Sequence, residues 1–130
     1  MFTFDNIPAP QKPPLFSQLR GLLKPDGKIV SVVSSPDIYL NEWASFSTKA
    51  FPENRLAKAG DVVRIIVTDH EDARPVEDVL YTDESYREIY RKVGLQVVEM
   101  LKPLATGTEP FAWVNETQIA PWVIYVLQPN

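Results

Sequence analysis

The sequence predicts a single α/β domain built around a mixed β-sheet. A helix that begins at paired prolines passes through a tight turn into a β-branched strand at 28–35, which is half of a βαβ unit. A second capped helix follows further along the chain. The last strand, at 122–127, is apolar on both faces, so we expect it inside the sheet and not at its edge.

Composition limits the classes of function. The chain has 130 residues, a net charge of −4 and no cysteine, so disulfides, thiolate zinc sites and cysteine nucleophiles are excluded. An acidic chain does not offer the basic surface that coats nucleic acid. Neither a membrane-length apolar run nor a signal peptide occurs in the sequence. We therefore expect a cytoplasmic protein that acts on a small molecule and binds neither nucleic acid nor a membrane.

The N-terminal third contains the first predicted strand–helix–strand unit. Residues 1–5 form a short extended piece that ends before Pro8 and Pro10. Apolar residues at helical spacing follow Pro13 and Pro14, and proline is well tolerated in a first helical turn. The run at 28–35 is typical of a strand buried on both faces of a parallel sheet.

The middle of the chain is longer than a simple connection, and we expect an insertion at about 36–81. Its first part, 36–59, is amphipathic and predicts partly helical structure. Residues 61–68 and 76–81 form two strand candidates joined by a short charged loop, which predicts a hairpin.

The C-terminal part predicts a helix and a strand pair. Thr82 caps a helix that has acids in its first turn and Gly94 at its C-cap. The following strand, 95–101, carries Glu99 and suits an edge. We expect the strand at 122–127 to pair antiparallel with it and to insert between it and the 28–35 strand.

Two motifs in this order resemble a known family. The turn LKPDGK at 23–28 is similar to the LKPGG element that joins the fourth helix to the fifth strand in class I S-adenosylmethionine-dependent methyltransferases. The segment YTDESY at 81–86, followed by VGL at 93–95, resembles the helix that leads into that family's sixth strand. The inserted antiparallel last strand is the family's distinguishing feature, so nearly the whole chain resembles the C-terminal half of this Rossmann-like fold.

The resemblance also implies what the chain lacks. The family binds its cofactor at the ends of the first, second and fourth strands, with a glycine-rich loop after the first strand. The five glycines of this chain are too far apart to form such a loop. We therefore expect a partial fold without the first three βα units, with no intact S-adenosylmethionine site and no activity on its own.

Candidate site residues come partly from the resemblance and partly from position. Asp5 and Asn6 follow the apparent fourth strand, where the family places groups near the methyl donor and acceptor, although a simple turn there would also favour them. Ser34 ends a strand at its carboxyl edge, where ligands collect in open α/β sheets. Ser35 is better explained as a cap for a helix that begins at Pro36.

Three further candidates lie on the insertion. Trp43 and Arg64 belong to the segment that covers the substrate in the family, although core packing and surface exposure explain them equally well. His70 is the only histidine and the only histidine-based general base available. It sits in a charged loop, where a solvated tip is the more common structure, and we expect no metal site.

The sequence leaves more than one function open. The first is a fragment of a small-molecule methyltransferase. The second is a non-catalytic interaction module derived from that fold, and the third is an unrelated α/β binding domain. A half-fold leaves a sheet edge unpaired, and unpaired edges recruit another strand. We therefore expect a homodimer formed by edge pairing or by exchange of an element.

Overall fold

The computed structural model describes residues 3–69, 71–72 and 74–130. Among these residues, no helix is long and apolar enough to cross a membrane. In chain order the elements are the 3-10 helices η1 (Thr3–Asn6) and η2 (Ala9–Gln11), α1 (Lys12–Gly21), β1 (Ile29–Ser34), η3 (Pro36–Tyr39), β2 (Phe46–Ser47), η4 (Pro52–Leu56), β3 (Val62–Val67), β4 (Pro75–Val79), α2 (Asp83–Lys92), β5 (Leu95–Leu101) and β6 (Trp122–Pro129).

The first sheet has the strand order β1-β6-β5, with β6 antiparallel to both neighbours. Ile29 lies opposite Leu127 on one side, and Leu101 lies opposite Ile124 on the other. The last strand is therefore inserted between β1 and β5, as the sequence predicts. The β5 strand is an edge strand, and its pairing register shifts between Val97 and Glu99.

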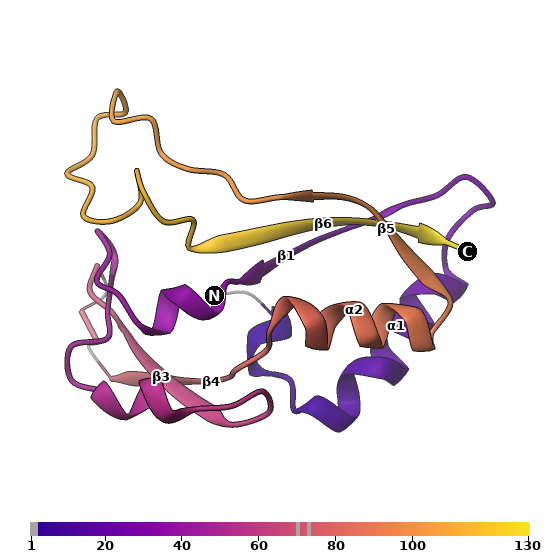
Figure 1. Cartoon of the computed structure of the whole chain (residues 1–130), viewed down its shortest axis with the longest axis horizontal. Helices are drawn as coiled ribbons and strands as arrows, with labels where there is room; N and C mark the ends of the chain where they lie inside the picture. The colour runs from indigo at the N-terminus through magenta and orange to yellow at the C-terminus, as the bar shows by residue number, and fades with distance from the viewer. Residues whose placement is uncertain (1–2, 70, 73) are drawn as a thin grey trace.

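Both α-helices pack on the same face of this sheet (Figure 1). Alternate residues of β6 point toward them and are buried, while the residues between are only half-buried. The buried side chains form one apolar cluster: Phe16, Val33, Tyr86, Ile89, Tyr90, Leu95, Val123, Tyr125 and Leu127. This cluster combines residues from both helices and all three strands, so it holds the first sheet and its helices together.

The opposite face of the first sheet carries no helix among the described residues (Figure 1). Val30 on β1 is 65% exposed there. The expectation that this strand is buried on both faces of a parallel sheet is therefore wrong for the described part of the chain. The β-branched run reflects strand propensity on both faces, but only one face meets a packing partner.

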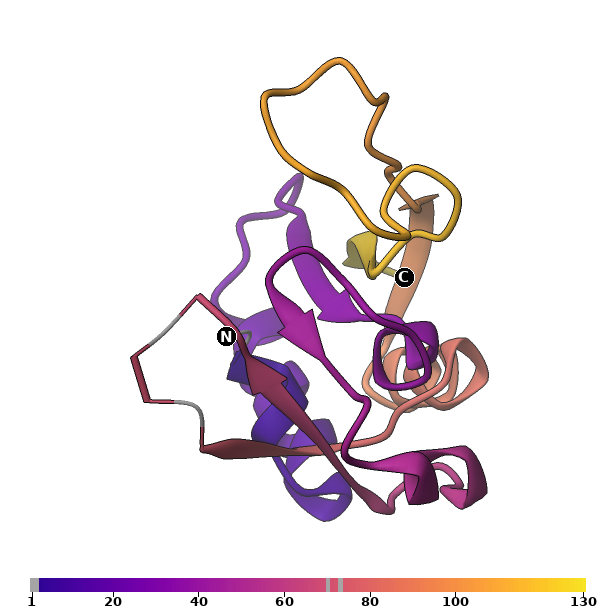
Figure 2. The same cartoon turned by 90° about the vertical axis from the view of Figure 1, so that its left-hand side faces the viewer.

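The second sheet has the order β2-β3-β4, and both of its pairings are antiparallel. It contains the predicted hairpin, in which Val63 lies opposite Asp78. Figure 2 shows this hairpin beside the first sheet, with the loop 102–121 extending away from the helices. The segment 36–59 forms two 3-10 helices and the short β2, with no longer helix. A second apolar cluster lies here: Ile38, Tyr39, Trp43, Val63, Ile65 and Leu80.

The N-terminal strand predicted at 1–5 is not present in the described residues, because Thr3–Asn6 is a 3-10 helix. This turn brings the Asp5 carboxylate to the end of β1, where it accepts hydrogen bonds from Ser34. The N-terminal segment therefore contacts the end of β1 through the Asp5 carboxylate and does not pair with it as a strand. Met1 and Phe2, which the prediction also included, lie outside the described residues.

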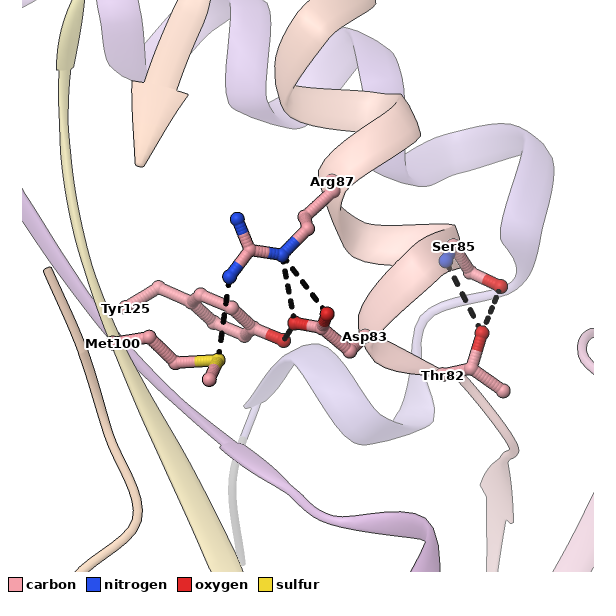
Figure 3. A network of polar contacts seen from close by, with 6 residues as sticks. All are labelled: Thr82, Asp83, Ser85, Arg87, Met100 and Tyr125. Carbon is pink, nitrogen blue, oxygen red and sulfur yellow. Dashed lines mark hydrogen bonds and ion pairs between the residues drawn. The ribbon is translucent and has the colours of Figure 1, made fainter. Parts of the chain in front are cut away.

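The start of α2 is fixed to the first sheet by a polar network (Figure 3). The Thr82 hydroxyl accepts a hydrogen bond from the Ser85 amide at 3.1 Å, as predicted for a helix cap. Burial opposes ionisation of Asp83, but hydrogen bonds from Tyr125 and Arg87 outweigh it and lower the pKa of this carboxyl. At the other end of α2 the C-cap is Val93, and Gly94 after it has a φ of 78°, the left-handed conformation that commonly follows a C-cap.

Candidate functional site

A small cavity of about 220 Å³ lies where β1 ends, beside the second apolar cluster. Its lining comes from η1, η3 and both sheets: Asp5, Ser34, Ile38, Tyr39, Phe46, Ile65, Asp78 and Trp122. All of these side chains are buried except Phe46 and Trp122, which are half-buried. These two aromatic side chains are therefore the most exposed part of the lining.

Asp5 is one of two carboxylates in this cavity, and it is only 3% exposed. Its Oδ2 accepts a hydrogen bond from the Ser34 hydroxyl at 2.6 Å, and its Oδ1 accepts one from the Ser34 amide at 3.2 Å. Burial raises the pKa of Asp5, while the two bonds from Ser34 partly counteract this effect. Both oxygens are therefore held in place by the end of β1.

Asp78 is the second carboxylate and comes from the inward face of β4. Its Oδ2 accepts a hydrogen bond from the Tyr39 hydroxyl at 2.9 Å. Its Oδ1 is buried and has no hydrogen-bond partner among the described residues. Burial raises the pKa of Asp78 to about 6, although the bond from Tyr39 lowers it. Asp78 thus brings a mostly ionised carboxylate with one unused acceptor into the cavity at neutral pH.

Lys12 lies beside the cavity and is completely buried. Its Nζ donates to the Tyr86 hydroxyl at 3.1 Å and sits 3.6 Å from the centre of the Tyr81 ring. Burial lowers the pKa of Lys12 to about 8, and the attraction of Asp5 and Asp78 opposes that shift. The ammonium group is therefore held by tyrosines, and together with the N-terminal charge it offsets part of the buried negative charge.

The structure brings together only some of the predicted site residues. Asp5 and Ser34 meet in the cavity, whereas Asn6 is exposed to solvent. Trp43 is buried in the second cluster, and its indole N–H donates to the Ile38 carbonyl at 2.8 Å. Arg64 forms an exposed ion pair with Glu77 and does not line the cavity. His70 lies outside the described residues.

Other polar residues of this region have structural partners. Ser35 accepts a hydrogen bond from the Asp37 amide, which caps η3. The Glu116 carboxylate accepts hydrogen bonds from the backbone amides of Ala44, Val114 and Asn115. The bond from Ala44 connects the loop 102–121 to the segment that leads into β2. Within the ranges that the structure describes, no cluster of potential metal ligands occurs.

Sequence reasoning missed the two most unusual charged groups, Lys12 and Asp78. Lys12 lies four residues before the buried Phe16, on the apolar face of α1. Asp78 alternates with Val76 and Leu80, so it takes an inward position of its strand. In both cases the signal is a charge at a core position of an otherwise regular pattern, which is a common mark of a functional residue.

Comparisons with known proteins identify the fold. No family model matches the chain, and no curated protein matches it. Among solved structures, the chain is similar to the CcbJ methyltransferase from Streptomyces caelestis, with 13% identity and a TM-score of 0.57 over 98% of this chain and 56% of the other. It is also similar to an S-adenosylmethionine-dependent methyltransferase from Clostridium acetobutylicum ATCC 824, with 10% identity and a TM-score of 0.52 over 94% of this chain and 52% of the other.

These similarities show that the chain has a methyltransferase-like α/β fold. The chain spans about half the length of each solved structure that it matches. The fold class predicted from the sequence, a partial methyltransferase fold with an inserted antiparallel last strand, is therefore confirmed.

The described residues do not fit a complete S-adenosylmethionine site. The glycines with positive φ are Gly60, Gly94 and Gly107, which lie in three separate loops and form no glycine-rich turn. The cavity at the end of β1 is smaller than the roughly 300 Å³ at which ligand pockets usually begin. Its two carboxylates would repel the carboxylate of the cofactor, and its lining contains no lysine or arginine to pair with that group.

Proposed function

We propose that this chain is the acceptor-binding part of an S-adenosylmethionine-dependent methyltransferase that acts on a small molecule. The observation that carries the proposal is the cavity with two buried carboxylates, in a chain with a methyltransferase-like fold. It lies at the carboxyl end of β1, where open α/β sheets collect their ligands. Asp5 and Ser34, both candidates from the sequence, belong to it.

In this proposal the two carboxylates have different tasks. Asp5 accepts two hydrogen bonds from Ser34 and positions the end of β1 beside the acceptor. Asp78 has a free oxygen and a pKa of about 6, so it accepts a hydrogen bond or a proton from the nucleophile of the acceptor. Residues 36–81 form an insertion that covers the acceptor.

We further propose that the chain is inactive alone and that a cofactor-binding half completes the enzyme. That half is either a preceding segment of a longer polypeptide or a partner chain. The absence of cysteine from the sequence supports a cytoplasmic location for the assembly.

Calorimetry and a transfer assay test this proposal. Titration of the chain with S-adenosylmethionine is expected to show no binding at micromolar concentration. When a glycine-rich βαβ segment encoded in frame upstream is included, the protein is expected to bind the cofactor and to transfer a labelled methyl group to small molecules in a cell extract. Micromolar binding by the present chain would contradict the missing cofactor site, and an extended protein that binds the cofactor but transfers no methyl group would contradict the methyltransferase function.

A second candidate is a non-catalytic module that self-associates through β1. The Ser34 amide donates to Asp5 and the Ser35 amide donates to the Pro121 carbonyl next to β6, so alternate amides of β1 point away from the sheet. Val30 and Val32 therefore direct their amides to an edge that no strand among the described residues covers. Such an edge favours a homodimer, by strand pairing or by exchange of an element.

Sedimentation analysis tests the second candidate. The chain is expected to sediment as a dimer. Val30→Lys is expected to shift it toward monomer, because a charged side chain on an edge strand disfavours pairing with a second strand. Val62→Lys is the matched control, because Val62 is an exposed valine of the second sheet. A wild-type chain that remains monomeric at high concentration would contradict self-association.

A further inference from the structure

The charges around the cavity are not balanced within the described residues. Among the described side chains, Asp5 and Asp78 bring two carboxylates and Lys12 brings one ammonium group, and the N-terminal charge also attracts both carboxylates. That ammonium group is held by Tyr86 and Tyr81 and forms no ion pair within 4.0 Å in the part of the chain that the structure describes. Asp78 Oδ1 is left buried without a donor. A buried acceptor of this kind costs free energy unless a bound group supplies the missing hydrogen bond or charge.

The rest of the lining suits a cation. Tyr39, Phe46 and Trp122 place three aromatic rings around the cavity, and the faces of such rings attract ammonium groups. No lysine or arginine is among the lining residues. A ligand with a carboxylate or phosphate would meet two carboxylates of like charge here, so the site disfavours anions.

A second cavity of about 260 Å³ shares Phe46 and Trp122 with the first. The rings of Phe46 and Trp122 have their centres 6.2 Å apart in an edge-to-face arrangement, and both rings line both cavities. The remaining lining of the second cavity is Trp43, Ala44, Ser45, Phe111, Trp113, Glu116 and Pro121. Glu116 already accepts three backbone hydrogen bonds, so this space presents a largely apolar surface.

From this arrangement we infer that the site binds a small-molecule amine with an apolar arm. The ammonium group donates to Asp78 Oδ1 in the first cavity, and the arm passes Phe46 and Trp122 into the second. The inference rests on the proposed function in one respect, which is that the bound amine is the methyl acceptor. Asp78 then receives the proton that the amine must lose before its nitrogen can act as a nucleophile.

Binding of simple probes to the whole chain tests the inference without any cofactor. The probes are phenethylamine, phenethyl alcohol, phenylacetate and ethylamine, titrated near neutral pH while backbone amide chemical shifts are followed by NMR. Phenethylamine is expected to cause saturable shifts at Ser34, Asp78 and Trp122. We expect the alcohol to bind about tenfold or more weakly, because it lacks the charge. Ethylamine is expected to be weaker because it lacks the arm, and phenylacetate is expected not to bind.

A matched pair of variants locates the amine. Asp78→Asn removes the buried charge with little change of shape and is expected to weaken phenethylamine binding about tenfold or more. Glu77→Gln removes an exposed carboxylate from the adjacent position of β4 and is expected to leave binding unchanged. Melting curves establish that both variants are folded, and the selectivity of the wild-type chain stands independently of either variant.

The outcomes separate this inference from the proposed function. Equal binding of the alcohol and the amine, or equal affinities in the two variants, would overturn the amine site and leave the methyltransferase proposal in place. Amine binding that depends on Asp78, together with an extended protein that transfers no methyl group, would support the amine site and overturn the methyltransferase function.

Discussion

The two packed regions of this molecule differ in how far apart their residues lie in the sequence: the first joins distant segments, and the second joins segments that are closer together. The first cluster joins Phe16, Val33, Tyr86 and Leu127, which come from both helices and from strands far apart in the chain. The second cluster is assembled around the β3–β4 hairpin and the short η3 helix, and it borders the cavity with Asp78. The first region is closed by apolar and aromatic contacts with the Lys12 ammonium held at its border, whereas the second borders a cavity that contains two buried carboxylates.

This difference separates stability from function. A dry apolar cluster that joins distant segments holds the fold, since removal of any buried side chain leaves a space that the neighbours cannot refill. A cavity with a buried unpaired acceptor lowers stability and provides a place for a ligand. We therefore expect substitutions in the first cluster to cost more than substitutions beside the cavity.

The largest effect is expected from Leu127→Ala at the centre of the first cluster. Leu127 is fully buried, so the substitution is expected to lower the free energy of unfolding by about 4 kcal/mol. Ile65→Ala is the counterpart in the second cluster, and we expect about 2 kcal/mol because Ile65 already lines a cavity. Denaturant unfolding of both variants measures the difference. Equal losses would contradict the contrast between the two regions.

The next effect concerns pH and Asp78. Its carboxyl has a pKa of about 6 in the fold, above the ordinary value of 3.8, so its ionisation destabilises the protein by about 3 kcal/mol at neutral pH. This loss is fully present above pH 6 and disappears as the pH falls toward 4. Asp5 shifts in the same direction, while Lys12 stays cationic over this range and Tyr39 stays neutral.

Asp78→Asn is therefore expected to remove most of this pH dependence. The measurement is the free energy of unfolding of wild type and variant between pH 4 and pH 8. The variant is expected to gain stability relative to wild type as the pH rises from 4 to 6, and the difference is expected to stay constant above pH 6. Glu77→Gln serves as the control on the same strand, and a wild-type curve parallel to that of Asp78→Asn would show that Asp78 is not the buried charge that titrates.

A smaller effect is expected at Gly94, which ends the helix that packs on the first sheet. Its φ of 78° and the Arg20 Nε atom, 3.1 Å from the site of an added Cβ, both oppose a side chain. Gly94→Ala is expected to cost about 1–2 kcal/mol in thermal or denaturant unfolding. Gly21→Ala, at the open end of α1, is expected to be neutral or slightly stabilising. A loss at Gly21 as large as that at Gly94 would contradict this account.

The smallest effect is expected from removing the side chains that cap a helix in each region. Thr82 caps the ten-residue α2 with a hydrogen bond of 3.1 Å, whereas Ser35 caps the four-residue η3 with one of 3.4 Å. Thr82→Ala is expected to cost about 1 kcal/mol and Ser35→Ala about half of that. Thermal unfolding of the two variants measures both values, and a larger loss at Ser35 would reverse the expected order.

Sequence patterns predicted the first region well and the second region poorly. The paired prolines of α1, the Thr82 cap and the doubly apolar last strand are local signals, and each led to the observed element. The segment 36–59 has no dominant period, so its short 3-10 helices were expected only as partial helix. The strand predicted at 1–5 failed because apolar residues at a chain end do not show whether a neighbouring strand is present to pair with them.

The amino-acid sequence alone determined the order of the elements and the central place of β6, because periodicity and capping depend on neighbouring residues. It also provided Asp5 and Ser34 as candidates through their positions beside a strand end. Only the tertiary structure showed that Asp78 and Lys12 reach the same interior from β4 and α1. Their unpaired charges arise from packing between distant segments, and the residues nearby in the chain do not reveal such packing.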